Sequence, residues 1–215
     1  MKKLLIIFAL LLVTFTVNAQ SCPDDDHPHM IDLGLPSGTK WACCNVDDDH
    51  SKQSPTNYGG YYAWGETKEH EDLIYNWSTY IHCDGSSSTC HDLGSDIAGT
   101  QYDVAHVKWD GSWVMPSWEQ QEELLKNCTY TWTTVNGVNG GQFTGSNGGS
   151  IFLPAAGGRW DDGLYDADSY GYYWSSTQDQ LYSYGAVYLY FNSGYAGWYY
   201  NYGRSNGRMV RPVPK

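Results

Sequence analysis

The sequence predicts an α+β domain in which two helices accompany small antiparallel sheets and long loops. A clear helical pattern is confined to a short segment from Ser117 to Cys128. Strand-like alternation of period two runs from Tyr182 to Phe191, and Gly and Asn cluster at turn positions after Thr129. The length of 215 residues fits a leader followed by one domain of about 100 to 200 residues.

The composition is acidic and rich in aromatic residues. The chain has 12 Lys and Arg against 24 Asp and Glu, which gives a formal net charge of −12. An acidic surface repels phosphate backbones, which argues against nucleic acid as a partner. Aromatic residues make up 16% of the chain, too much apolar surface for a disordered acidic tail. We therefore expect a folded protein.

Residues 1–19 have the pattern of a cleaved signal peptide. Lys2 and Lys3 precede an apolar run from Leu4 to Val17, and Ala19 supplies a small residue for cleavage. The apolar run is too short for the roughly 20 residues of a membrane-spanning helix. We expect an exported protein without a membrane span, in which residues 20–29 form an acidic tether before a domain at residues 30–215.

Cys22 is a candidate site for a lipid anchor. Ser21 precedes it and Pro23, Asp24, Asp25 and Asp26 follow it, which resembles the surface-export signal of Bacteroidetes lipoproteins. Free secretion and a lipid anchor at Cys22 both stay open. The expected location is accordingly extracellular, periplasmic or on the surface of the outer membrane.

The first half of the domain contains a hairpin, an insertion and a short helix. The segments 31–35 and 40–46 flank Pro36 and Gly38, which suit a turn. The stretch 66–95 is polar and poor in aliphatic residues, so we expect a long surface insertion. A short helix is predicted from Asp103 to near Trp109.

The second half begins with the clearest helix and continues as strands. The helix starts at Ser117, where Gln120 completes a capping box. Turns between later strands are predicted at three Asn-Gly sequences: Asn136-Gly137, Asn139-Gly140-Gly141 and Asn147-Gly148-Gly149.

Period-two alternation near the C-terminus predicts a sheet with one aromatic face. The odd positions Val187, Leu189 and Phe191 are apolar, whereas the even positions are Tyr or Ala. The next strand is expected to place Trp198, Tyr200 and Tyr202 on the same aromatic face. The alternative is that these rings form a second buried face or only stiffen the sheet as cross-strand pairs.

Six cysteines in an exported chain favour disulfides. Cys83 and Cys90 flank a short polar loop and are expected to pair, although His82 and His91 beside them leave a Cys2His2 zinc site as an alternative. Cys43 and Cys44 are adjacent in a predicted strand, so only one faces the interior. We expect Cys44 to pair with Cys128, and the partners of Cys22 and Cys43 stay open.

Six sequence blocks resemble one known family. They are Asp32–Val46, Tyr61–Thr67, Trp109–Ser117, Ser150–Gly157, Tyr173–Ser176 and Val210–Val213. Together they resemble the Fibrobacter succinogenes major paralogous domain, which is abundant in exported Bacteroidetes proteins. That family is similar to the formylglycine-generating-enzyme branch of the C-type lectin fold. The resemblance implies an irregular α+β domain with two helices, small sheets, many loops and adjacent termini.

The resemblance does not imply an enzyme. The sulfatase-activating oxidase carries a reactive cysteine pair late in its chain, and no cysteine follows Cys128 here. The calcium-ligand strings Glu-Pro-Asn, Gln-Pro-Asp and Trp-Asn-Asp of sugar-binding lectins do not occur. Glu66 and Asp161, each close to a Trp, are the candidate acid/base pair for glycan hydrolysis. We therefore expect no catalytic activity.

Metal binding has one weak set of expected ligands. Four aspartates in a Gly-rich loop carry the hard oxygen atoms that Ca²⁺ prefers: Asp161, Asp162, Asp166 and Asp168. The alternative is a solvated acidic loop. Otherwise we expect no cofactor.

The expected function is recognition of a glycan or a surface protein through aromatic rings. Flat rings stack on the C–H faces of sugars, and nearby polar groups add directional hydrogen bonds. The expected binding residues are Trp160, Asp161, Tyr165, Trp174, Tyr188, Tyr190 and Trp198. A structural or adhesive module of the cell envelope is the alternative, and a formylglycine-generating-enzyme-like or glycan-active enzyme is third.

Overall fold

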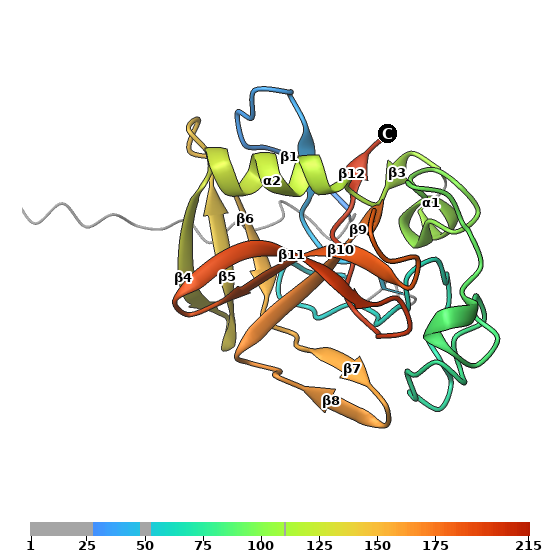
Figure 1. The fold of residues 1–215 in the computed structure, drawn as a ribbon. Coiled ribbons are helices and arrows are strands. Elements are labelled where there is room, and N and C mark those ends of the chain that lie inside the picture. Colours follow the sequence, from blue (N-terminus) through green and yellow to red (C-terminus); the bar gives the residue numbers. More distant parts are fainter. Residues whose placement is uncertain (1–27, 48–52, 110) are drawn as a thin grey trace, which may run out of the picture.

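Two three-stranded antiparallel sheets meet beneath one helix (Figure 1). The computed structural model describes residues 28–47, 53–109 and 111–215. One sheet has the order β4-β5-β6 and the other the order β11-β10-β9. The strands are β4 (Thr129–Val135), β5 (Val138–Thr144), β6 (Ser150–Pro154), β9 (Tyr170–Gln178), β10 (Gly185–Asn192) and β11 (Tyr195–Gly203). Phe143 of β5 and Phe191 of β10 join the sheets, with ring centroids 6.1 Å apart.

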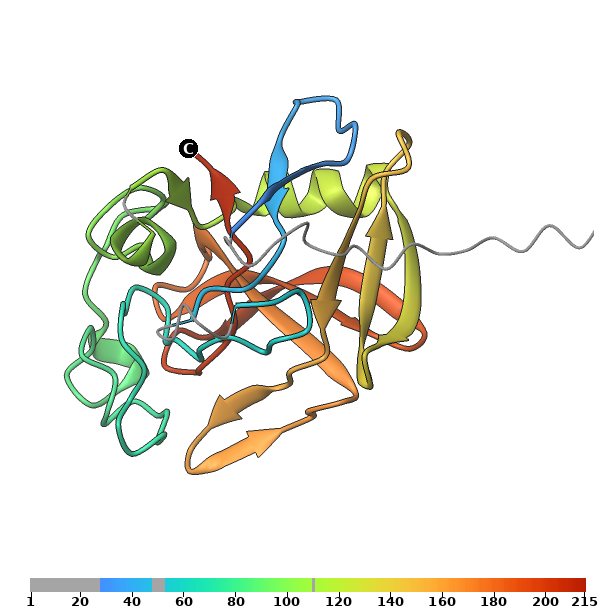
Figure 2. The ribbon, with the colours of Figure 1, turned by 180° about the vertical axis from the view of Figure 1, so that it is seen from behind.

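Smaller elements surround these sheets. The helices are α1 (Val104–Lys108), α2 (Trp118–Asn127) and a 3₁₀ turn, η2 (Ser87–Thr89). Two-stranded ladders join β1 (Met30–Asp32) to β2 (Lys40–Ala42), β3 (Trp113–Val114) to β12 (Val213–Pro214), and β7 (Gly158–Trp160) to β8 (Gly163–Tyr165). The β7–β8 hairpin projects from the body of the domain (Figure 2). The α+β class is thus confirmed, with β-structure predominating.

Both predicted helices are confirmed at their N-termini. Ser117 caps α2, where its Oγ accepts the N–H of Gln120 and the Gln120 side chain accepts the N–H of Ser117. The buried carboxylate of Asp103 caps α1 and accepts the N–H groups of Ala105 and His106. It also accepts N–H groups from Gly99 and Met115. Burial raises the pKa of Asp103, while these four hydrogen bonds act in the opposite direction. Within the described ranges, no helix is long and apolar enough to span a membrane.

Two of the three predicted Asn-Gly turns are confirmed. Asn136-Gly137 joins β4 to β5 with positive φ at both residues, and Asn147-Gly148-Gly149 lies between β5 and β6. The turn predicted at Asn139-Gly140-Gly141 is wrong, because these residues lie inside β5. A Cβ on Gly140 would lie 2.5 Å from Cζ of Phe152, so neighbouring side chains require glycine in this strand.

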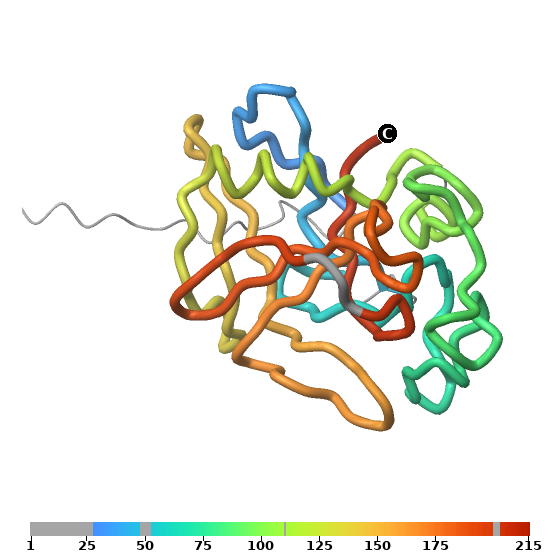
Figure 3. Tube along the Cα trace, viewed as in Figure 1, coloured from blue at the N-terminus to red at the C-terminus, as the bar shows by residue number. Residues whose placement is uncertain are grey.

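The first and last described segments of the domain lie together (Figure 3). The N–H of Ala42 donates to the carbonyl of Pro212 at 2.9 Å. The fully buried guanidinium of Arg211 reinforces this contact by donating to Oδ1 of Asn45 at 2.8 Å. It also donates to three carbonyl oxygens, those of Ala42, Cys43 and Phe152. One arginine therefore links β2, β6 and the C-terminal segment.

The stretch 66–95 is only partly a surface insertion. Tyr75 and Tyr80 within it are buried, contrary to the expectation from its few aliphatic residues. The hydroxyl of Tyr80 donates to the carbonyl of Trp64 at 2.6 Å, and Nε of Arg204 donates to that hydroxyl at 2.9 Å. Tyrosine anchors the loop because its ring is buried while its hydroxyl finds a partner.

One of the two predicted disulfides is formed. Cys83 and Cys90 are bonded, which also removes the zinc alternative. The pair Cys44–Cys128 is wrong: Cys44 is fully buried in the cluster around Trp64 and Trp174, whereas Cys128 is a half-buried thiol at the end of α2. The predicted signal peptide, Cys22 and most of the predicted acidic tether lie outside the described residues.

Candidate functional site: the tyrosine face of the β9–β11 sheet

Five tyrosines share one surface of the β9–β11 sheet. Tyr190 lies opposite Tyr172 in the ladder, and Asn192 lies opposite both Tyr170 and Tyr195. Tyr199 lies on the same surface, since it pairs with Tyr188. We call this surface the tyrosine face: Tyr170, Tyr172, Tyr190, Tyr195 and Tyr199. Leu189 and Phe191 point the other way and are fully buried, which confirms the predicted alternation along β10.

The rings of the tyrosine face form a partly solvent-exposed array. Tyr195 is 53% exposed and Tyr199 is 54% exposed, while the other three are half-buried. Tyr170 and Tyr172 stack nearly parallel with centroids 5.9 Å apart, and Tyr190 lies 5.4 Å from Tyr195. The sheet thus presents several ring surfaces to the solvent at once.

Trp174 and Tyr188 lie on the same side of the sheet but do not reach the solvent, so the expectation that their rings are exposed is wrong. Both are buried, because the guanidinium of Arg208 packs onto their rings. The guanidinium carbon lies 3.6 Å from the Tyr188 centroid and 4.6 Å from the Trp174 ring. Tyr172 forms a third wall at 5.0 Å. The chain's own cation therefore occupies an aromatic cage at this end of the sheet.

Trp198 lies on the opposite surface, so the expectation that it shares the aromatic face is wrong. It pairs with Leu189 in the ladder and makes an edge contact with Trp118 of α2, with centroids 5.9 Å apart. Aromatic residues occupy consecutive positions in β11, so alternation alone could not assign them to a face. The missed residue is Tyr199, whose place follows from the irregular register between Ala186 and Tyr188.

The β7–β8 hairpin extends the tyrosine face. Trp160 and Tyr165 stack with centroids 4.1 Å apart and an interplanar angle of 7°, and Tyr165 is 39% exposed. A Cβ on Gly158 would lie 3.3 Å from Tyr172 and 3.7 Å from Trp160, so these two rings approach the same point of the backbone. The structure thus brings Trp160, Tyr165 and Tyr190 to one surface, and their role as ligand-binding residues stays a prediction.

A polar depression of about 590 Å³ adjoins the tyrosine face. Tyr170 borders both, and Trp132 of β4 contributes a second ring. Hydroxyl, amide and carboxylate groups line the rest, from Asn139, Asp168, Ser169, Asn192 and Ser193. Asp168 accepts a hydrogen bond from the hydroxyl of Tyr58 at 2.7 Å; burial and this carboxylate raise the pKa of Tyr58 to about 12. Rings and hydrogen-bonding groups thus meet at one end of the sheet.

The predicted calcium ligands do not form a cluster. Asp161, Asp162, Asp166 and Asp168 are all exposed, and Asp166 binds the hydroxyl of Tyr172 at 2.8 Å. The described part of the chain holds no group of three or more His, Cys, Asp or Glu side chains arranged for a metal ion. Asp161 lies next to Trp160 on the hairpin, at the edge of the aromatic surface.

Glu66, which with Asp161 forms the candidate acid/base pair, is buried and hydrogen-bonded within its own loop. Its Oε2 lies 2.6 Å from Nε2 of His70, and its Oε1 accepts the N–H of Ile81 at 3.0 Å. Nδ1 of His70 contacts the carbonyl of Ile74 at 2.6 Å. The hydrogen bond with Glu66 raises the pKa of His70, against the effect of burial. These contacts show that the Glu66 carboxylate holds the loop 66–81 together.

The site is therefore an exposed aromatic surface on a mainly β domain. In comparisons with known proteins, the chain matches no family model, and no curated protein or solved structure is significantly similar to it.

Proposed function

We propose that the protein is an exported, non-catalytic domain that binds a glycan through the tyrosine face and the adjoining Trp160–Tyr165 stack. The observation that carries the proposal is the set of partly exposed rings that borders a polar depression. Rings cover the apolar C–H faces of sugars, and the amides and hydroxyls of the depression would bind sugar hydroxyls. The export signal in residues 1–19 would bring the domain to glycans outside the cytoplasm.

We also propose that the fold is C-type lectin-like and related to the Fibrobacter succinogenes major paralogous domain. Two helices, small sheets and neighbouring terminal segments support this. The sequence blocks that carry the resemblance also contact each other: Nε1 of Trp64 donates to Ser175, and Nε1 of Trp174 donates to Tyr62. These blocks build the interior, so the ligand would be set by the tyrosines outside them.

A structural or adhesive module of the cell envelope is the second candidate. The burial of Trp174 and Tyr188 around Arg208 favours it, because these two rings serve the protein's own packing. An adhesive role would use the exposed tyrosines against a protein, since Tyr is enriched at protein interfaces.

Binding of the mature protein, residues 20–215, to a glycan array and to polysaccharides in affinity electrophoresis tests the first proposal. We expect the double variant Tyr195→Ala/Tyr199→Ala to weaken binding at least tenfold, since two stacked rings contribute about 1 kcal/mol each. Tyr182→Ala is the matched control, because Tyr182 is also exposed but precedes β10.

The outcomes separate the two candidates. Glycan binding that is lost in the double variant and kept in Tyr182→Ala supports the proposal. No binding to any glycan, or equal binding by all three proteins, contradicts it. In that case, retention of envelope proteins that depends on Tyr195 and Tyr199 would support the adhesive module.

A further inference from the structure

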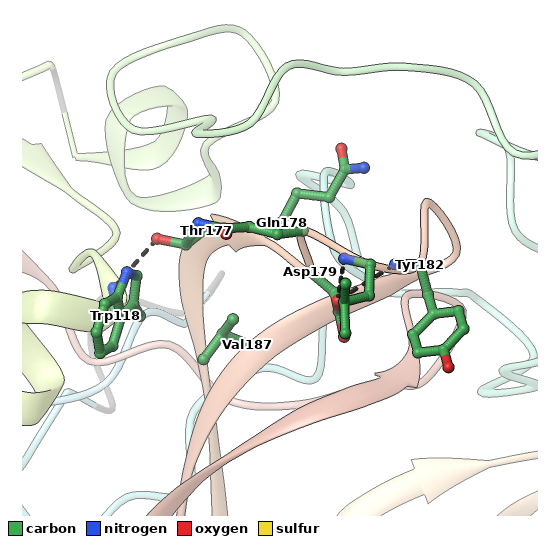
Figure 4. Close-up of a pocket in the computed structure, with 8 residues that line it drawn as sticks. Trp118, Thr177, Gln178, Asp179, Tyr182 and Val187 are labelled. Atoms are coloured by element: carbon green, nitrogen blue, oxygen red, sulfur yellow. Dashed lines mark hydrogen bonds between the residues drawn. The ribbon is translucent and has the colours of Figure 1, made fainter.

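A second cavity, of about 410 Å³, lies between α2 and the loop that joins β9 to β10 (Figure 4). Its lining includes Trp118, Gln178, Asp179, Leu181, Tyr182 and Val187. Tyr170, the first residue of β9, lines the polar depression beside the tyrosine face, whereas Gln178, the last residue of β9, lines this cavity. The two sites are thus about 25 Å apart along the strand.

Asp179 is the central feature of this cavity. It is only 4% exposed although it is a carboxylate in a loop. Its Oδ1 accepts the N–H groups of Leu181 at 2.7 Å and Tyr182 at 3.2 Å. Its Oδ2 is buried and has no hydrogen-bond partner among the described residues. A buried carboxylate oxygen without a donor is costly, so the site calls for a donor from outside the chain.

Neighbouring groups do not supply that donor. Oε1 of Gln178 is likewise buried and unpartnered among the residues that the structure describes. Arg204 reaches the same loop, but its Nη1 donates to the carbonyl oxygen of Ser183, and it forms no ion pair with Asp179 within the described chain. The side chain of Gln178 points away from the Asp179 carboxylate (Figure 4), so Oδ2 of Asp179 is the acceptor of this cavity that lacks a donor among the described residues.

The walls of the cavity are apolar. Val187 is buried at its base, Trp118 contributes a ring from α2, and Leu181 lies at the mouth with 83% of its surface exposed. An apolar wall beside an acceptor-only end is complementary to a molecule with a hydrocarbon part and a cationic N–H group. The volume suits a small ligand, since such sites measure about 300 to 1,000 Å³.

We propose that this cavity binds a small organic ammonium ion that carries an apolar group. The ammonium donates to Oδ2 of Asp179, and the hydrocarbon part lies against Val187 and Trp118. Charge supports this class of ligand, because the chain has a net charge of −12 and would attract cations. The site is separate from the tyrosine face, so the proposal stands whether or not the protein binds a glycan.

Titration of ¹⁵N-labelled mature protein with n-hexylammonium tests the proposal. We expect saturable amide shifts confined to the lining of the cavity, at residues 177–182 and Val187. Hexan-1-ol, a neutral compound of similar length, should bind at least tenfold more weakly, because it lacks the charge that pairs with Asp179. Hexanoate should not bind, because its carboxylate would be repelled by the carboxylate of Asp179.

Two single substitutions provide the matched comparison. Asp179→Asn keeps an oxygen for the N–H groups of Leu181 and Tyr182 but removes the charge, and should weaken n-hexylammonium binding at least tenfold. Asp162→Asn removes the same charge and should leave binding unchanged, because Asp162 is an exposed carboxylate between β7 and β8 and does not line this cavity.

Four results would overturn the proposal. The first three are an absence of saturable shifts, equal binding of hexan-1-ol and n-hexylammonium, and unchanged binding by Asp179→Asn. The fourth is that calcium chloride alone produces the same saturable shifts, which would indicate a metal site instead. If Asp179→Asn does not fold, the comparison between the ammonium and the alcohol on the native protein decides.

Discussion

The guanidinium carbon of Arg208 lies 3.6 Å from the centroid of the Tyr188 ring, and both side chains are buried. This contact divides the aromatic residues of β9 and β10 into two groups. Trp174 and Tyr188 beside Arg208 belong to the interior, Tyr172 at the edge of the cage is half-buried, and Tyr170 and Tyr190 farther along the same strands reach the surface. A single arginine thus determines where the protein's core ends and its exposed aromatic surface begins.

Replacing Arg208 with Lys should destabilise the protein although it keeps the charge. A lysine ammonium has no planar surface to stack on Tyr172, Trp174 and Tyr188 together. We expect the free energy of unfolding in urea to fall by about 1 to 2 kcal/mol. Arg159→Lys is the control: Arg159 is half-buried and lies 5.1 Å from one ring, that of Tyr61, so its loss should be smaller. Equal losses would contradict this account.

Arg211 stabilises the fold in a different way, through hydrogen bonds to the buried Asn45 side chain and to three carbonyl oxygens. The variant Arg211→Leu leaves these four acceptors without their donor. Since each buried, unsatisfied group costs about 1 to 3 kcal/mol, we expect a loss of at least about 3 kcal/mol in the free energy of unfolding. A loss below about 1 kcal/mol in urea denaturation would show that water replaces the guanidinium at little cost.

Local sequence signals predicted much of the architecture. The capping box at Ser117, the Asn136-Gly137 turn and the alternation along β10 each depend on residues within one or two turns or along one strand. Such signals were confirmed because the chain needs no distant partner to satisfy them.

Features that depend on distant segments were predicted less well. Arg208 follows Tyr188 by 20 positions, and nothing in the local pattern indicates that it fills the cage and buries Trp174. Gly140 has the sequence pattern of a turn residue, but glycine is required there because Phe152 of the neighbouring strand leaves no space for a side chain. In the candidate site, Trp160, Tyr165 and Tyr190 were identified from composition and alternation. Tyr199 was missed, because the irregular register of β11 changes which residues face solvent.

His70 should make stability depend on pH. Its two ring nitrogens contact a carboxylate and a carbonyl, both acceptors, so only the protonated imidazole satisfies both. The pKa of His70 is raised above 6.5 in the folded protein, chiefly by Glu66. The contribution to stability is therefore complete below about pH 6.5 and is lost as pH rises through the folded-state pKa.

Urea denaturation from pH 5.5 to 9 measures this dependence. We expect His70→Gln to lower the free energy of unfolding by about 1 to 3 kcal/mol at pH 6 and by less at pH 9. His91→Gln is the control, because His91 and Asp84 form an exposed pair and contribute little. A parallel pH dependence in the native protein and His70→Gln would show that another group is responsible.

Cys128 should react slowly with alkylating reagents. Burial, and to a smaller extent the carboxylate of Glu123, raises the pKa of the Cys128 thiol from 9.0 to about 11. The thiolate is the reactive form, and a two-unit rise reduces its fraction at pH 8 about 100-fold. We expect iodoacetamide to modify this residue about 100 times more slowly than an unperturbed thiol, with the rate rising tenfold per pH unit between pH 8 and 10.

Intact-mass measurements of the native protein follow this reaction, and Cys128→Ser assigns it to the residue. Glu123→Gln should accelerate modification modestly, because it removes only the smaller of the two causes. Cys83 and Cys90 do not interfere, since their disulfide protects them. Rapid modification that levels off near pH 9 would contradict the burial of Cys128 against α2 and β4, because an unperturbed thiol is already half ionised there.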